Sequence, residues 1–217
     1  MRKVPLPDGA KLFLYTAALN ATINGAASNA ANMVVTAANT LAVKDLVVID
    51  SDDYPELTGR VARVTAATVD AVTLGGIDTS SAEKFPPGGT VRLIVLDEDE
   101  WQRLPYVPAF GLSGGELNTS STSYLDFDND QEFRTGRSAR RLEYSISWKG
   151  DGAARAALLA GDGLESVHRL LFKDGTASYY VGELHYDDVP STEKGVEQTT
   201  TSTVLLTGAP SNLAKAV

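Results

Sequence analysis

The sequence predicts a mainly β protein: a β-sandwich or barrel with one flanking α-helix, into which a second, smaller β domain is inserted. Three observations support this fold class. Short runs rich in β-branched residues recur between Gly, Asn, Asp or Pro residues. The segment Arg141–Trp148 alternates apolar and polar side chains with the period of two that is typical of a half-buried strand. One segment, Ala153–Ala160, has a strongly helical composition.

The first half of the chain contains six candidate strands and one candidate linker. Thr68–Asp70 is expected to form the tip of a hairpin between two of these strands. The Ala-, Asn- and Gly-rich segment Asn20–Asn32 is expected to be a linker. The expected strands are Lys11–Thr16, Val34–Thr36, Leu46–Ile49, Arg60–Thr65, Ala71–Leu74 and Thr90–Val95. We therefore expect residues 18–96 to form a small barrel-like β domain, inserted into a β-sandwich domain made of residues 1–17 and 97–217.

The second half begins after the acidic block Asp97–Glu100 and contains a long polar stretch. Trp101–Val107 leads into a Pro-rich turn. In Gly111–Asp130, where Gly, Ser, Thr and Asp predominate, we expect a strand at the start and a long mobile loop after it. Further strands are expected at Arg141–Trp148, Ser166–Lys173, Ser178–Tyr186 and Val196–Leu206.

The helix has recognisable start and stop signals. Asp151 is expected to cap its N-terminus, and Gly161 or Gly163 to end it in a left-handed conformation. The apolar face is expected to lie against the sheet; its members are Ala154, Ala157 and Leu158.

Composition excludes several classes of function. The 19 basic and 28 acidic residues give a net charge of −9, which argues against a conventional nucleic-acid-binding surface. The absence of cysteine excludes disulfides and thiolate metal sites. Neither a secretory signal nor a membrane span is expected, since no apolar run is long enough. Synthesis in the cytoplasm followed by release in a particle would fit.

One motif suggests a catalytic serine but lacks the structural context that such a serine needs. Gly111–Gly115 matches the nucleophile pattern G-x-S-x-G around Ser113, yet the following residues do not form a helix. The two histidines, His168 and His185, lie in expected strands. We expect no catalytic residue and no enzymatic activity.

An acidic run suggests a calcium loop. Its carboxylates are Asp126, Asp128, Asp130 and Glu132, but the sixth and twelfth positions of the helix–loop–helix pattern hold Gln131 and Arg137 instead of Gly and Glu. A looser calcium site is the alternative to a solvated acidic loop, which we favour. We expect no bound metal or cofactor.

The acidic run is followed directly by a basic cluster. Its arginines are Arg134, Arg137, Arg140 and Arg141. Carboxylates of one copy could meet the guanidinium groups of the next, in a head-to-tail contact that generates rings or filaments. The alternative is that the charges pair within one chain. The sequence leaves both open.

Several short motifs, in the same order, resemble the major tail tube proteins of lambda-like long-tailed bacteriophages. They are Leu12–Thr16 (LFLYT), Trp101–Leu104, Gly115–Leu117, Ser123–Asp126, Thr135–Ala139, Trp148, Asp174–Thr176, Gly182 and Leu206–Gly208 with Pro210. Segment Ala18–Leu96 departs from the resemblance, because it replaces a short connection in the simplest members.

The resemblance implies a structural virion protein. Six copies would form a ring, and rings would stack on a tape measure protein between the tail terminator and distal tail proteins. DNA would pass through the lumen without specific binding. Ring stacking would involve the long loop and its flanks, with the candidate residues Glu116, Tyr124, Asp126, Asp128, Asp130, Arg134, Arg137, Arg140 and Arg141. The alternatives are a subunit of a contractile tail or secretion tube, or a virion module that binds a receptor or glycan.

Overall fold

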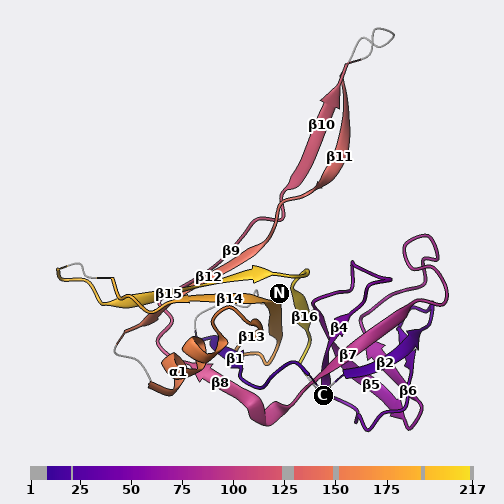
Figure 1. The fold of residues 1–217 in the computed structure, drawn as a ribbon, viewed down its shortest axis with the longest axis horizontal. Helices are drawn as coiled ribbons and strands as arrows, with labels where there is room; N and C mark the ends of the chain where they lie inside the picture. Colours follow the sequence, from indigo (N-terminus) through magenta and orange to yellow (C-terminus); the bar gives the residue numbers. More distant parts are fainter. Residues whose placement is uncertain (1–8, 21, 124–129, 149–151, 192–193, 216–217) are drawn as a thin grey trace.

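The computed structural model describes residues 9–20, 22–123, 130–148, 152–191 and 194–215. Figure 1 shows three parts: a large sheet with one helix, a small barrel beside it, and a two-stranded ribbon that projects away from both. The protein is mainly β with one α-helix in these residues, as predicted. Among the described residues, no helix is long and apolar enough to span a membrane.

The large sheet has the strand order β8-β1-β13-β14-β15-β12-β9, and β16 pairs with β14. Every pairing in it is antiparallel. Within the described residues its strands are β1 (Lys11–Tyr15), β8 (Trp101–Leu104), β9 (Ala109–Ser113), β12 (Arg141–Ser147), β13 (Glu165–Leu171), β14 (Ala177–Asp187), β15 (Thr199–Leu206) and β16 (Ser211–Leu213).

The sheet is strongly curved, as its connectivity requires. Strands β8 and β9 lie at opposite ends of the strand order, yet only residues 105–108 join them. An extended connection of this length spans roughly 17 Å, much less than the width of a flat seven-stranded sheet. The two edges of the sheet therefore approach each other.

The concave face of the sheet is covered by α1 (Gly152–Gly161). Alternate residues of the central strands point to this side, including Leu142, Tyr144 and Ile146 of β12. From the helix, Ala154 and Leu158 are buried and Ala157 packs against the same cluster, so the predicted apolar face is confirmed.

The opposite face of the sheet is covered by the barrel. Tyr179 and Val181 of β14 pack against Val48 and Val61 of the barrel. Strand β14 is thus buried on both faces along its first six residues, which explains its nearly continuous apolar sequence.

The barrel is closed by six strands in the order β2-β3-β6-β5-β4-β7. Its interior is filled by apolar side chains such as Met33, Ile49, Leu74 and Leu93. Within the described residues the strands are β2 (Thr22–Ala27), β3 (Val34–Thr36), β4 (Leu46–Asp50), β5 (Arg60–Thr68), β6 (Ala71–Gly75) and β7 (Thr90–Leu96).

The structure corrects two expectations. Segment Asn20–Asn32, expected to be a linker, contains β2, which closes the barrel between β3 and β7. Its glycine has a packing role, because a Cβ atom on Gly25 would lie 2.6 Å from the Thr36 carbonyl oxygen. Segment Gly111–Asp130, expected to be a mobile loop after its first strand, contains a second strand, β10 (Leu117–Thr122), which pairs with β11 (Gln131–Arg137).

Candidate assembly surfaces

The ribbon formed by β10 and β11 is more exposed than the other strands in the described part of the chain. Every residue of β10 is exposed, and so are most residues of β11. The apolar side chains of Leu117 and Phe133 are 52% and 46% exposed. Figure 1 shows the ribbon leaving the body beyond β9 and β12 and contacting no other element along its length.

A ribbon of this kind has little intrinsic stability. An isolated two-stranded hairpin is marginally stable in water, because it orders its backbone without burying an apolar face. Its strands contain mainly Ser, Thr, Asn and charged residues, so the ladder of backbone hydrogen bonds is its main internal support. The ribbon is therefore suited to gaining stability from a partner surface.

The root of the ribbon is held by specific contacts. The Arg137 guanidinium donates to the Gly115 carbonyl over 3.0 Å, and the Ser138 hydroxyl donates to the Glu116 carboxylate over 2.5 Å. The bond from Ser138 also lowers the pKa of Glu116. Gly114 adopts a φ of +81°, and a Cβ atom there would lie 1.9 Å from the Ala139 carbonyl oxygen. These contacts fix the direction in which the ribbon leaves the sheet.

The residues expected to form the stacking interface gather on this element. Glu116, Arg137 and Arg140 lie at the root, and Arg134 lies further along β11. Arg141 begins β12. Asp130 precedes β11 and is exposed, whereas Tyr124, Asp126 and Asp128 lie outside the described residues. Among the residues that are described, none of the four arginines forms an ion pair.

Both edges of the large sheet are open. Within the part of the chain that the structure describes, strand β8 pairs only with β1, and β9 pairs only with β12. Along its outer side, each edge strand presents backbone N–H and C=O groups that can pair with another chain. These edges were not identified from the sequence, because no local pattern distinguishes an edge strand from its neighbours.

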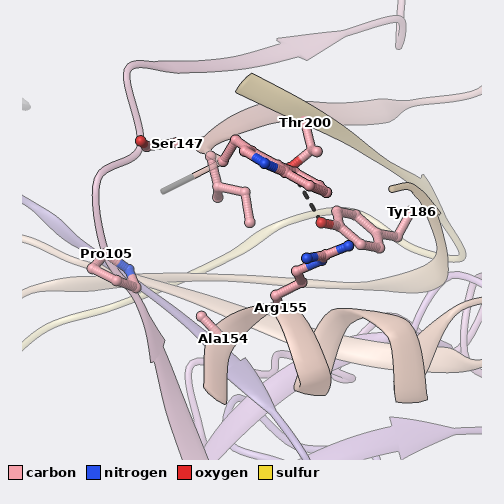
Figure 2. A pocket seen from close by; sticks show the side chains of 8 residues that line it. Pro105, Ser147, Ala154, Arg155, Tyr186 and Thr200 are labelled. Carbon is pink, nitrogen blue, oxygen red and sulfur yellow. Dashed lines mark hydrogen bonds between the residues drawn. The ribbon is translucent and has the colours of Figure 1, made fainter. Parts of the chain in front are cut away.

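Two polar clusters stabilise the fold of the single chain and are not candidate assembly surfaces. The Arg155 guanidinium stacks 4.0 Å from the Trp148 ring and binds Asp188 with two hydrogen bonds of 2.7 and 2.5 Å. This pairing raises the pKa of Arg155 and lowers that of Asp188. Figure 2 shows Arg155 on α1 beside Tyr186, whose hydroxyl is hydrogen-bonded to Thr200. Tyr186 donates to Asp188 and contacts Thr200, so these polar groups satisfy one another and anchor α1 to the sheet.

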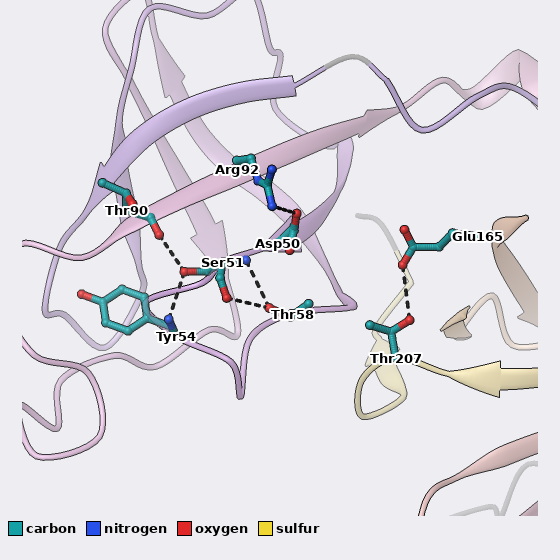
Figure 3. A network of polar contacts seen from close by, with 8 residues as sticks. All are labelled: Asp50, Ser51, Tyr54, Thr58, Thr90, Arg92, Glu165 and Thr207. Carbon is teal, nitrogen blue, oxygen red and sulfur yellow. Dashed lines mark hydrogen bonds and ion pairs between the residues drawn. The ribbon is translucent and has the colours of Figure 1, made fainter. Parts of the chain in front are cut away.

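The second cluster stabilises a turn of the barrel (Figure 3). The Ser51 hydroxyl donates to the Thr90 carbonyl over 2.6 Å and accepts from the Tyr54 backbone N–H over 3.0 Å. Beside it, Arg92 and Asp50 pair across β7 and β4 at 2.5 Å. The same view shows Thr207, which follows β15, donating to Glu165 at the start of β13, and this distance is 3.3 Å.

The motif considered for catalysis does not form a site in the described chain, whereas Asp126 and Asp128 of the candidate calcium loop lie outside the described residues. Ser113 is exposed on β9 and is followed by a strand, whereas a nucleophile elbow needs a helix there. His168 is fully buried, and its Nε2 lies 2.9 Å from the Tyr144 hydroxyl. Within the described residues, no three His, Cys, Asp or Glu side chains lie together so that they could hold a metal ion.

Open sheet edges and an unsupported ribbon are features of structural subunits that assemble with other chains. The sequence profile of the family described as "Phage tail tube protein, TTP" matches residues 52–215. The chain belongs to this phage tail tube family and is a structural component of the virion tail. The matched region includes the ribbon and the barrel strands β5 to β7. Among curated proteins, none matches the chain.

Proposed function

We propose that six copies of this protein form a ring and that the rings stack into the tail tube through which DNA leaves the virion. The observation that carries the proposal is the ribbon of β10 and β11. It projects from the body with its residues exposed and has no supporting layer within the described chain. A second copy stacked in the tube would supply that layer.

Ring closure would use the open edges of the large sheet. Strand β8 of one copy and β9 of the next each offer a side that no other described strand pairs with. Pairing between neighbours leaves no edge in a closed ring, which removes the risk of uncontrolled strand addition.

Stacking would use the charged groups of the ribbon and its root. The proposed contact residues are Glu116, Tyr124, Asp126, Asp128, Asp130, Arg134, Arg137, Arg140 and Arg141. The absence of ion pairs on the four arginines, within the described part of the chain, favours contacts between copies over contacts within one copy. A head-to-tail contact of this type repeats without closing, as a stack of rings requires.

The tube would act with other tail proteins and with DNA. A tape measure protein would occupy the growing tube in the host cytoplasm, and the tail terminator and distal tail proteins would bind its ends. The net charge of −9 is compatible with a lumen that DNA passes without specific binding.

The proposed domain division separates the apolar interior of the barrel from the apolar cluster between the large sheet and α1, and a third cluster lies between the two domains. Residues 1–17 and 97–217 would form the tube domain, and residues 18–96 the inserted barrel domain. The barrel has its own apolar interior, which supports this division.

Electron microscopy of the purified protein tests the proposed function. Hollow tubes of uniform width with six-fold end views are the expected result. A monodisperse monomer at high concentration that binds glycans would instead support a receptor-binding module. Tubes found only inside a contracting sheath would support the contractile-tail alternative.

A further inference from the structure

A groove lies between the two edges of the large sheet. It has a volume of about 450 Å³ and is lined by the start of β1, by β8, by the connection from β8 to β9, and by Phe110 and Leu170. This volume lies within the range of pockets that bind small molecules or peptide side chains.

The groove is lined by apolar side chains and, at its exposed rim, by basic ones. Val107, Phe110 and Leu170 are only partly buried, although they pack against the apolar core on the helix side of the large sheet. On the rim, Lys11 and Arg103 are exposed and, within the described residues, form no ion pair. The groove therefore fits a partner that combines apolar side chains with carboxylates.

One residue at the rim has an unusual conformation. Tyr106 has a φ of +55°, which a non-glycine residue rarely adopts, and its side chain is 72% exposed. Its carbonyl oxygen accepts from the Ser147 backbone N–H over 3.1 Å. Strained backbone conformations cluster at functional sites, and tyrosine is enriched among the residues that dominate binding interfaces.

We infer that this groove receives the tip of the ribbon of a second copy in the adjacent ring. The tip has the matching composition, since the sequence Tyr124-Leu125-Asp126-Phe127-Asp128 alternates large apolar residues with carboxylates. This inference rests on the proposed function, and it names the surface that accepts the ribbon.

The arrangement of the fold supports this assignment. In Figure 1 the ribbon projects from one side of the body, whereas β8, which lines the groove, lies on the opposite side. The ribbon therefore points away from the groove of its own chain, and a copy stacked above would bring its groove toward the tip. Contacts between opposite sides of identical subunits propagate into an open stack.

Two other contacts compete with this one. The arginines at the ribbon root could accept the tip, but Arg137 is already engaged with Gly115, and Arg140 packs along the same turn. Residues 1–8 continue from the groove at Gly9, but Arg2 and Lys3 would add positive charge beside Lys11 and Arg103. The charge of the rim favours the acidic tip.

Cross-linking in assembled tubes tests the inference, and the cysteine-free chain gives a clean background. Chains carrying Tyr106→Cys and chains carrying Phe127→Cys are mixed, assembled and treated with a short bismaleimide. We expect a covalent dimer at least tenfold more abundant than in a control mixture of Phe127→Cys with Val69→Cys. Val69 is 75% exposed at the turn between β5 and β6 of the barrel. Tubes with equal cross-linking in both mixtures would overturn the assignment.

A binding measurement separates this inference from the proposed function. A fluorescent peptide with the sequence of residues 121–131 is titrated into the unassembled chain, and Arg103→Glu is expected to weaken its binding at least tenfold. If the peptide binds with this dependence but the protein forms no tubes, the groove assignment is supported and the proposed tube function is contradicted. Absence of binding, or binding that appears only after residues 2–8 are removed, would overturn the groove assignment.

Discussion

The buried pair of Tyr144 and His168 shows how burial controls the chemistry of single residues in this fold. Their side chains face each other in the large sheet, and the Tyr144 hydroxyl lies 2.9 Å from Nε2 of His168. Burial lowers the pKa of His168 to about 3 and raises that of Tyr144, so both are neutral at physiological pH. The pair therefore supports the core and offers no base for catalysis.

This burial predicts a loss of stability in acid. Below about pH 6.5 the unfolded chain takes up a proton on His168, whereas the folded chain does not until the pH approaches 3. The free energy of unfolding should therefore fall by about 2 kcal/mol between pH 7 and pH 5 from this residue alone. Urea denaturation of the unassembled chain, followed by tryptophan fluorescence, measures it.

Two variants isolate this effect. His168→Gln keeps a polar partner for Tyr144 and should remove this part of the pH dependence. Tyr144→Phe should instead lower the free energy of unfolding by about 1 kcal/mol at every pH, because it removes only the hydrogen bond. An unchanged pH dependence in His168→Gln would show that another group causes the acid sensitivity.

Arg134 on the ribbon and Arg141 at the start of β12 form no ion pair within the described residues, so replacing them should affect assembly and not folding. Arg134→Glu combined with Arg141→Glu should raise the concentration needed for tube formation at least tenfold, because acidic groups of the adjacent copy would then be repelled. The control combines Lys84→Glu with Lys194→Glu, which changes the net charge equally at exposed positions. Light scattering follows assembly, and equal behaviour of the two variants would refute this contact.

At the scale of elements, the side chains on one face of α1 hold the helix against the sheet. Leu158 is fully buried against the sheet, whereas its neighbour Leu159 is 49% exposed. Leu158→Ala should lower the free energy of unfolding by about 2–5 kcal/mol, and Leu159→Ala by less than about 0.5 kcal/mol. Thermal or urea denaturation compares them, and similar losses would contradict the observed orientation of the helix.

The elements that the sequence predicted are those with one buried face. Strand β12 was identified because its alternation reflects a sheet with a core on one side. Strands β10 and β11 were not predicted from the sequence. Because both sides of the ribbon are largely exposed, its strands lack the alternating apolar residues of a half-buried strand and resemble a polar loop in composition. Strand β2 was missed because the barrel needs small residues at its close contacts, as at Gly25.

The candidate interface was predictable only where its residues are adjacent in sequence. The acidic run and the arginine cluster follow each other along the chain, so their composition identified them. The groove was not predictable, because it combines residues near positions 10, 105 and 170. Only the curvature of the sheet brings these segments together.

For the whole molecule, the junction between barrel and sheet determines whether they move as one unit. Three kinds of contact join them. Val61 donates its N–H to the Ser211 hydroxyl over 2.9 Å, and Arg63 donates to the Ala214 carbonyl over 2.6 Å. The third is the shared apolar cluster around Tyr179. The barrel is therefore docked on the sheet and is not a tethered appendage.

Close backbone packing at this junction predicts sensitivity to a single substitution. A Cβ atom on Gly208 would lie 2.2 Å from the Thr58 carbonyl oxygen, whereas one on Gly111 would meet nothing within 4 Å. Gly208→Val should lower the free energy of unfolding by about 1–3 kcal/mol and speed proteolysis between barrel and sheet. Gly111→Val should leave both unchanged, and equal effects would contradict the docked arrangement.

The central claim is that the ribbon of β10 and β11 gains its stability from another copy of the chain. Hydrogen exchange of residues 117–122 and 131–137, measured before and after assembly, tests it most directly. We expect exchange close to that of an unfolded peptide in the unassembled chain and at least hundredfold slower exchange in tubes. Ribbon amides as protected as those of β14 before assembly, or unprotected in tubes, would contradict the claim.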